Sequence, residues 1–316
     1  MKQTLKQVIL SVLATFILAS CTKFSALNSV SDEHPGDQKT EPAGVIYGRD
    51  SRSEVHYVPS KMVQQISNLS AALIMSNRLK PLDKDFVEVV GESLQESENL
   101  CPSEKFIEQR TSAFCSGVLI DSTHVLTAGH CVFTQKECDE ASFVFGYEYF
   151  LGSITNYRVA RSNIYSCSRI VAAAKNAEGT PDDKLGFDFS IVELDRPVPA
   201  KMQIAINVND DLKRGDGLFT IGYPLGLPKK FADGKVASNN NQNIYFRASL
   251  DTYGGNSGPP VFNTRNGGLE GILISGEDDF VQAPDYDCRV SHKCTQGNCA
   301  GEQVLKMSKI KKYLSK

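Results

Sequence analysis

The stretch CSGVLIDSTHVLTAGHC, residues 115–131, ends an apolar run with a histidine that stands directly beside a cysteine. A second cysteine, Cys115, lies 16 positions before Cys131, in a run typical of the preceding strand. A disulfide between Cys115 and Cys131 would join a pair of strands and fix the loop that carries His130. The stretch therefore predicts a β framework that holds an imidazole on one of its loops.

Short β-rich runs recur along the chain, with turn residues between them and without helical periodicity. Such spacing indicates an all-β sandwich or a pair of barrels. Only GEQVLKMSKIKKYL, near the C-terminus, places apolar residues at helical spacing, which predicts one helix over about 302–314. The runs are FCSGVLI (114–120), SFVFGYEYF (142–150), NIYSCSRIV (163–171), DFSIVEL (188–194), GLFTIGY (217–223), QNIYFRASL (242–250) and LEGILIS (269–275).

The stretch TYGGNSGPPVF, residues 252–262, surrounds one serine with glycines and prolines. A serine hydroxyl is a poor nucleophile at neutral pH, so acyl transfer requires a base, a group that orients the base, and N–H donors for the oxyanion. Glycines before the serine allow consecutive N–H groups to point into one concavity. Gly255 and Ser257 are the expected oxyanion donors, and His130 is the expected base.

These two stretches resemble the histidine motif and the GNSG serine motif of the chymotrypsin-fold serine peptidases. FDFSIVELDRPV supplies the third member, since Asp188 precedes a strand in the pattern of the residue that orients the histidine. The order His130, Asp188, Ser257 is that of the family. The resemblance implies two packed six-stranded antiparallel β-barrels, over about 60–200 and 201–300, with the catalytic site in the cleft between them.

A finer resemblance links the chain to the glutamyl-endopeptidase-like bacterial branch, through GVIYGRDSRSEVHYV (44–58) and GGNSGPPVFN. Two positions depart from the family. Trypsins carry an aspartate that pairs with a newly freed N-terminus where this chain has Asn256, so that ion pair cannot form. Pro259 stands where the family prefers Gly or Ser, and it also argues against an α/β-hydrolase, whose nucleophile elbow needs a glycine there.

Residue preference is the point on which resemblance and residues disagree. Asp251 lies six positions before Ser257, where trypsin-like relatives carry the aspartate of the primary pocket, and a carboxylate there would bind Lys or Arg. Glutamyl-specific relatives use a histidine on the wall strand, but GILISGE (271–277) has none. Asp251 could instead bind backbone or Arg247, and a Leu-Ile wall would accept an apolar residue. The expected substrate-binding residues are Asp251, Thr252 and Gly276.

The N-terminal residues have the features of an export signal. Residues 1–20 carry two lysines, then a short apolar run, then small residues, as in a secretory signal rather than a membrane span. LASC (18–21) resembles a bacterial lipobox, which predicts a lipid on Cys21; the alternative is an ordinary cleavage site without lipid. The polar segment 21–44 is expected to be a flexible tether to a peptidase domain over 45–316. We therefore expect an exported protein, anchored at the periplasmic or surface face of the cell envelope.

Nine cysteines divide into Cys21 and eight others, an even set that suits disulfides in an oxidising compartment. Cys138 and Cys167 could form one bridge, and Cys101 could reach the cluster CRVSHKCTQGNC (288–299). That cluster lacks the paired Cys-x-x-Cys spacing of zinc sites, so we expect no metal. We also expect no cofactor.

The charge of the chain bears on its partners. The 34 Lys and Arg against 37 Asp and Glu give a net charge of −3, and no basic stripe suggests binding to nucleic acid. The predicted function is a serine endopeptidase that acts on proteins or peptides, with a possible preference for basic residues. The alternatives are a catalytically inactive peptide-binding lipoprotein on the same fold and a serine esterase.

Overall fold

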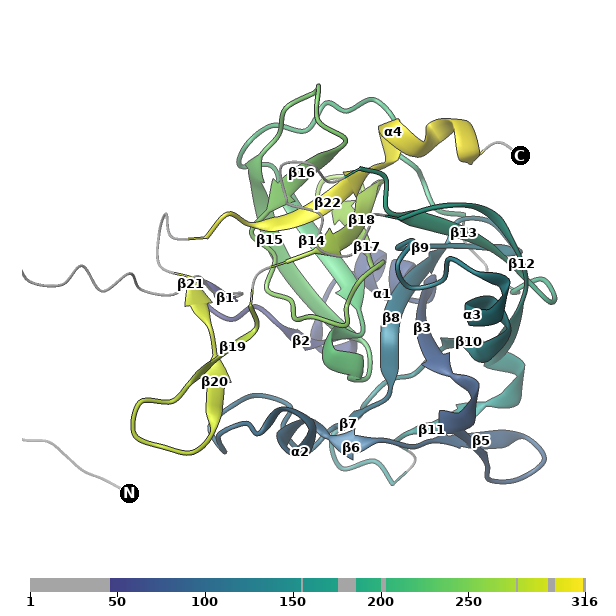
Figure 1. Ribbon diagram of the computed structural model, residues 1–316, viewed down its shortest axis with the longest axis vertical. Helices are drawn as coiled ribbons and strands as arrows, with labels where there is room; N and C mark the ends of the chain where they lie inside the picture. The colour runs from purple at the N-terminus through teal and green to yellow at the C-terminus, as the bar shows by residue number, and fades with distance from the viewer. Residues whose placement is uncertain are drawn as a thin grey trace, which may run out of the picture. The chain divides into compact units, whose positions relative to one another are not determined.

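The β-rich runs form two closed six-stranded antiparallel barrels, as predicted (Figure 1). The computed structural model describes residues 46–154, 156–175, 186–199, 203–276, 278–294 and 299–314. The predicted signal (1–20), Cys21 and the whole of the predicted tether (21–44) lie outside these residues. Several barrel strands are buried along their whole length, which explains why they appear in the sequence as continuous apolar runs rather than alternating ones.

The first barrel is built from six strands that lie between Ser70 and Leu194. Its strands follow one another around the barrel in the order β10, β12, β13, β9, β8 and β3, and pairing of β10 with β3 closes it. The register places Ser190 opposite Thr127, so the loop that follows β9 and the loop that precedes β13 lie at the same end of the barrel. The strands are β3 (Ser70–Met75), β8 (Ala113–Leu119), β9 (His124–Thr127), β10 (Ala141–Phe145), β12 (Ile164–Ala174) and β13 (Phe189–Leu194).

The second barrel runs further toward the C-terminus than predicted. Its order is β14, β17, β18, β22, β16 and β15, and pairing of β14 with β15 closes it. One apolar cluster joins the barrels, since it contains Phe143 of the first and Phe262 of the second. The strands are β14 (Gly217–Gly222), β15 (Lys230–Ser238), β16 (Tyr245–Ala248), β17 (Pro260–Asn263), β18 (Leu269–Ser275) and β22 (Glu302–Lys306).

The prediction of a helix from about residue 302 was wrong in its first part. Glu302–Lys306 is the strand β22, fully buried between β16 and β18, and its pairing with both completes the barrel. The helix is limited to α4 (Met307–Ile310), followed by a 3-10 turn, η6 (Lys311–Tyr313). Tertiary pairing therefore overrides the helical spacing of the apolar residues.

Short elements surround the barrels. The capping boxes Ser93/Glu96 and Thr134/Glu137 satisfy N–H groups at the starts of α2 and α3. None of the helices within the described ranges has the length and apolar character that crossing a membrane requires. The elements are α1 (Lys61–Ser67), α2 (Leu94–Glu98), α3 (Gln135–Glu140), β4 (Leu79–Pro81), β5 (Phe86–Val89), β6 (Glu92–Ser93), β7 (Arg110–Thr111), β11 (Arg158–Ala160), β19 (Phe280–Gln282), β20 (Arg289–Ser291), β21 (Lys293–Cys294), η1 (Val55–Tyr57), η2 (Ser76–Arg78), η3 (Arg161–Asn163) and η5 (Pro224–Gly226).

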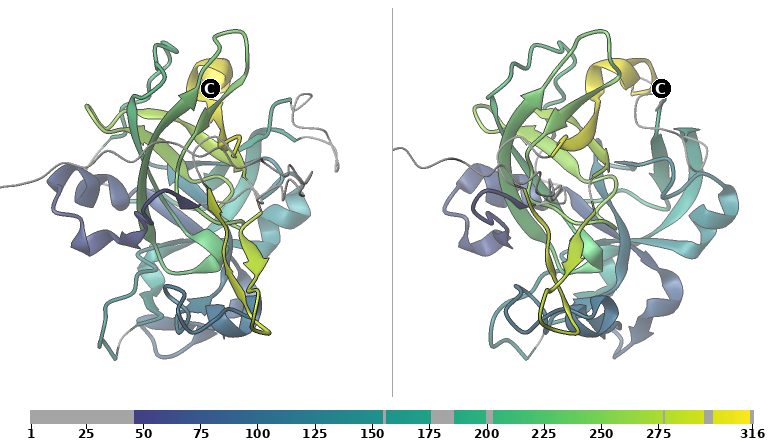
Figure 2. Two further views of the ribbon diagram at one scale, coloured as in Figure 1. Left: turned by 90° about the vertical axis from the view of Figure 1, so that its left-hand side faces the viewer. Right: turned by 60° about the vertical axis from the view of Figure 1, so that its left-hand side comes forward.

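The N-terminal segment, residues 46–57, is bound to the second barrel. Strand β1 (Ile46–Tyr47) pairs in parallel with β21, and β2 (Ser53–Glu54) extends the barrel sheet beside β15. Figure 2 shows this purple segment against the green strands. Opposite Glu54, Lys230 of β15 is buried, and its Nζ donates to Glu54 Oε2 (3.1 Å) and Gln109 Oε1 (2.9 Å).

Four disulfides fix the loops around the barrels. Cys115–Cys131 is confirmed, as are the Cys138–Cys167 bridge and the link from Cys101 to the C-terminal cluster, which uses Cys288. The fourth, Cys294–Cys299, closes a short loop within that cluster. All cysteines of the predicted even set are therefore paired, which fits an oxidising compartment.

The buried Lys230–Glu54 pair gives a stability prediction. Lys230→Met should lower the free energy of unfolding by about 3–5 kcal/mol, because it leaves the Glu54 carboxylate buried without its cation. Denaturant unfolding with intact disulfides measures the change. Lys235→Met, at an exposed position of the same strand, is the matched control and should change stability by less than about 0.5 kcal/mol. Equal stabilities of the two variants would contradict this role for the pair.

Candidate active site

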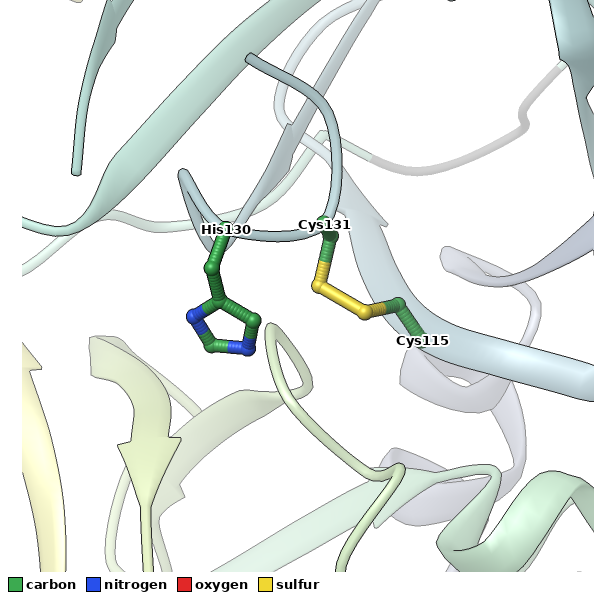
Figure 3. A group of neighbouring side chains, drawn as sticks. All are labelled: Cys115, His130 and Cys131. Carbon is green, nitrogen blue, oxygen red and sulfur yellow. A yellow bond between two sulfur atoms is a disulfide. The ribbon is translucent and has the colours of Figure 1, made fainter. Parts of the chain in front are cut away.

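His130 lies on the loop that follows β9. The Cys115–Cys131 disulfide ties this loop to β8, and Figure 3 shows the imidazole beside that bridge. The side chain of His130 keeps 39% of its surface exposed. The two sulfur atoms and the imidazole lie close enough together to suggest a metal site. Because the sulfurs are bonded to each other, they do not offer the thiolates that a zinc site would use.

Asp188 holds His130 in two ways. It immediately precedes β13, and its side chain is only 8% exposed. One carboxylate oxygen accepts the backbone N–H of His130 at 2.9 Å, and the other lies 2.9 Å from Nδ1. A carboxylate at Nδ1 favours the tautomer with the proton on that nitrogen, which leaves the lone pair on Nε2. The structure therefore brings together two of the three predicted catalytic residues in an orientation suited to a base.

The loop with Ser257 connects β16 to β17 of the second barrel and contacts the first barrel. The Ser257 carbonyl accepts the N–H of Ser116, on β8, at 2.8 Å, and lies 3.6 Å from Cys131 Sγ. The following residue, Gly258, has φ +88°, and a Cβ there would lie 2.3 Å from the Ser116 carbonyl. Only glycine permits this approach. The backbone of Ser257 is thus held beside the residue that follows His130.

Asn256 fixes the same loop from inside the protein. Its buried amide oxygen accepts from the N–H of Tyr223 (2.7 Å) and from Ser116 Oγ (2.8 Å). Its amide nitrogen donates to Thr252 Oγ1 at 2.6 Å. A neutral side chain with both donors and acceptors is suited to these partners. Thr252, predicted to bind substrate, is buried and supports Asn256 instead.

The predicted oxyanion donors have the expected backbone setting. Gly255 adopts φ +64°, a left-handed conformation that favours glycine. Within the described part of the chain, neither the Gly255 N–H nor the Ser257 N–H donates to a protein acceptor. The preceding N–H, of Gly254, is different, because both carboxylate oxygens of Asp279 accept it, at 2.9 and 2.7 Å. The loop is therefore anchored at Gly254, and its next N–H groups are available to a ligand.

A pocket of about 180 Å³ opens beside Ser257. Gly276, one of the predicted substrate-binding residues, lines it, but Asp251 and Thr252 do not. Three carboxylates that the sequence reasoning missed take part in its wall. The lining residues are Tyr253, Gly254, Ser257, Leu273, Ser275, Gly276, Asp278, Asp279 and Glu302.

The structure places Asp251 away from this pocket. Its buried carboxylate accepts the N–H groups of Tyr47 and Ser51, each at 2.7 Å. Burial raises the pKa of Asp251, and these two bonds oppose the shift. The residue thus binds the N-terminal segment, and the backbone-binding alternative describes it better than the pocket assignment does. The position of Asp251, six residues before Ser257, therefore did not determine where the Asp251 side chain points.

The Asp279 bond predicts a pH effect on stability. Burial raises the pKa of Asp279 from an ordinary value near 4 to about 7, so the folded protein holds a proton that the unfolded chain has lost. Wild-type stability from this group therefore falls as the pH rises from about 4 to 7 and is constant above that. Asp279→Asn removes the titration but keeps an acceptor for Gly254. Its melting temperature relative to wild type should increase by a few degrees between pH 4.5 and 8.

Differential scanning calorimetry at matched ionic strength provides the measurement. Asp278→Asn, at the exposed neighbouring position, is the control for the loss of one carboxylate from this loop. A flat profile for Asp279→Asn would show that Asp279 does not titrate as burial implies.

Comparison with known proteins identifies a matching family and several solved structures with a similar fold. Residues 115–272 match the family described as Trypsin-like peptidase domain. No curated protein matches the sequence. The structure is similar to the Vibrio cholerae VesB protease, at 15% identity and a TM-score of 0.51, over 85% of this chain and 67% of that one. This likeness concerns the fold alone.

Two further solved structures have lower scores. A Glu endopeptidase in complex with MPD is 16% identical, with a TM-score of 0.49 over 85% of this chain and 97% of that one. The human heparin binding protein is 14% identical, with a TM-score of 0.48 over 79% of this chain and 91% of that one.

Proposed function

The chain belongs to the family of trypsin-like peptidase domains, and from this premise we propose that it is a serine endopeptidase. His130, Asp188 and Ser257 form its catalytic triad. The observation that carries the proposal is the pair of hydrogen bonds between His130 and Asp188, one from the backbone N–H and one at Nδ1, beside the loop of Ser257. Its substrates are proteins or peptides.

In the proposed reaction, Ser257 Oγ attacks the carbonyl carbon of the scissile bond while His130 Nε2 accepts the hydroxyl proton. Asp188 orients the imidazole and stabilises its cationic form. The N–H groups of Gly255 and Ser257 stabilise the oxyanion of the tetrahedral intermediate. The imidazolium then donates its proton to the leaving amine. Water, deprotonated by His130, hydrolyses the acyl-enzyme and restores the serine.

Two alternative functions, an inactive peptide-binding protein and a serine esterase, can be distinguished from a peptidase by experiment. An inactive peptide-binding protein would need neither an oriented imidazole nor N–H groups without protein acceptors, and the described residues provide both. A serine esterase would use the same triad but would hydrolyse esters and leave peptide bonds intact. Reaction with a fluorophosphonate probe separates the inactive protein from both enzymes, and matched ester and amide substrates separate the enzymes from each other.

Ser257→Ala provides the test of the chemistry. Peptide turnover should fall by on the order of 10⁶-fold, because the nucleophile is lost while the fold is kept. Fluorophosphonate labelling should disappear with it. Ser249→Ala, which alters a hydroxyl that binds the backbone of Lys235, should retain both activities. Full proteolysis by purified Ser257→Ala protein would reject the triad.

The proposal extends to the location of the enzyme. We infer export from the signal-like residues 1–20 and the disulfides, and a lipid on Cys21 from LASC. Wild-type protein should then partition into the detergent phase of a phase-separating detergent. Cys21→Ser should appear in the aqueous phase or remain unprocessed. Identical partitioning of both forms would argue against the lipid.

A further inference from the structure

The pocket beside Ser257 contains a carboxylate that reaches it from the last strand of the second barrel. Glu302 is the first residue of β22, where it pairs with Ala248 of β16. The residue is 1% exposed, yet its side chain lines the pocket. From this placement we propose that Glu302 selects Lys and Arg at the residue before the cleaved bond. The inference rests on the proposed peptidase function.

The absence of a side chain at Gly276 leaves room for the Glu302 carboxylate. A Cβ at this position would lie 1.9 Å from Glu302 Oε2 and 2.8 Å from its Cδ. Any side chain there would therefore occupy the space of the carboxylate, and glycine leaves it in contact with the pocket. The hydroxyl of Tyr47 donates to Oε1 at 3.2 Å and helps to hold the group in place. The charge is thus positioned by the sheet and by the N-terminal segment.

The charges around the pocket have one sign. Among its described lining residues there are three carboxylates, of Asp278, Asp279 and Glu302, and no Lys, Arg or His. Asp279 already binds the Gly254 N–H with both oxygens, and Asp278 is exposed to solvent that screens it. Glu302, which is 1% exposed, lies where a bound cation would be shielded from water. A glutamate side chain would be repelled.

The rest of the wall suits a long basic side chain. Leu273 supplies apolar surface for the methylene stem of Lys or Arg, while the charged end reaches a carboxylate. Asp251 lies in the sequence at the position of the trypsin-like specificity aspartate, but its carboxylate accepts the backbone N–H groups of Tyr47 and Ser51. A carboxylate from a different strand thus takes the place that the sequence assigns to Asp251.

The test uses peptide substrates that are identical except for the residue before the cleaved bond, which is Arg, Lys, Leu or Glu. Wild type should cleave the Arg and Lys peptides best. Glu302→Gln keeps the shape and should lower kcat/KM for the Arg peptide by about 100-fold, with little change for the Leu peptide. Glu270→Gln, at a buried carboxylate of β18 that does not line this pocket, is the matched control and should leave the ratio of Arg to Leu cleavage unchanged. A best cleavage of Leu or Glu peptides, or an unchanged ratio in Glu302→Gln, would overturn the proposal.

A binding measurement separates this inference from the peptidase function and from any folding defect. Benzamidine, a cation, and benzamide, its neutral analogue, are titrated into Ser257→Ala protein, which has an intact pocket but no nucleophile. Benzamidine should bind at least about 10-fold more tightly. Equal binding would overturn the assignment of Glu302, whereas preferential benzamidine binding by a wild-type protein that neither labels nor cleaves would reject only the peptidase function.

Discussion

The buried amide of Asn256 is the interaction on which the candidate site depends. It joins the barrels, because its oxygen binds Ser116 of the first and the backbone of Tyr223 in the second, while its nitrogen binds Thr252. The next residue, Ser257, then meets Ser116 through its own carbonyl. Since every partner is neutral, the loop is held without a buried ion pair, which would carry a desolvation penalty.

Acidic residues around this loop have different tasks because their neighbours differ. Asp251 faces two backbone N–H groups of the N-terminal segment and fixes that segment to the barrel. Asp279 binds the Gly254 N–H and anchors the start of the loop. Glu302 lies against a glycine and lines the pocket. Local contacts therefore assign a role to each carboxylate, although all three lie within a small region of the second barrel.

The sequence predicted what local pattern and covalent chemistry determine. Apolar runs between turns indicated the barrels, and the spacing of cysteines indicated the bridge beside His130. The motifs identified Asp188, which the structure brings into contact with that histidine. The strand Glu302–Lys306 could not be predicted, because its apolar residues also fit a helix and only its two barrel partners decide between them. The direction of the Asp251 side chain likewise depends on a segment 200 residues away.

The order of the strands along the chain has a consequence for synthesis. Strand β1 finds its partner in β21, and the second barrel closes only when β22 has been made. A growing chain thus carries its histidine and serine before the last wall of the pocket exists. Such long-range pairing is slow to form, and the early strands keep unpaired edges until their partners are made. A product that stops short of residue 302 would lack a closed second barrel and, with it, a complete pocket.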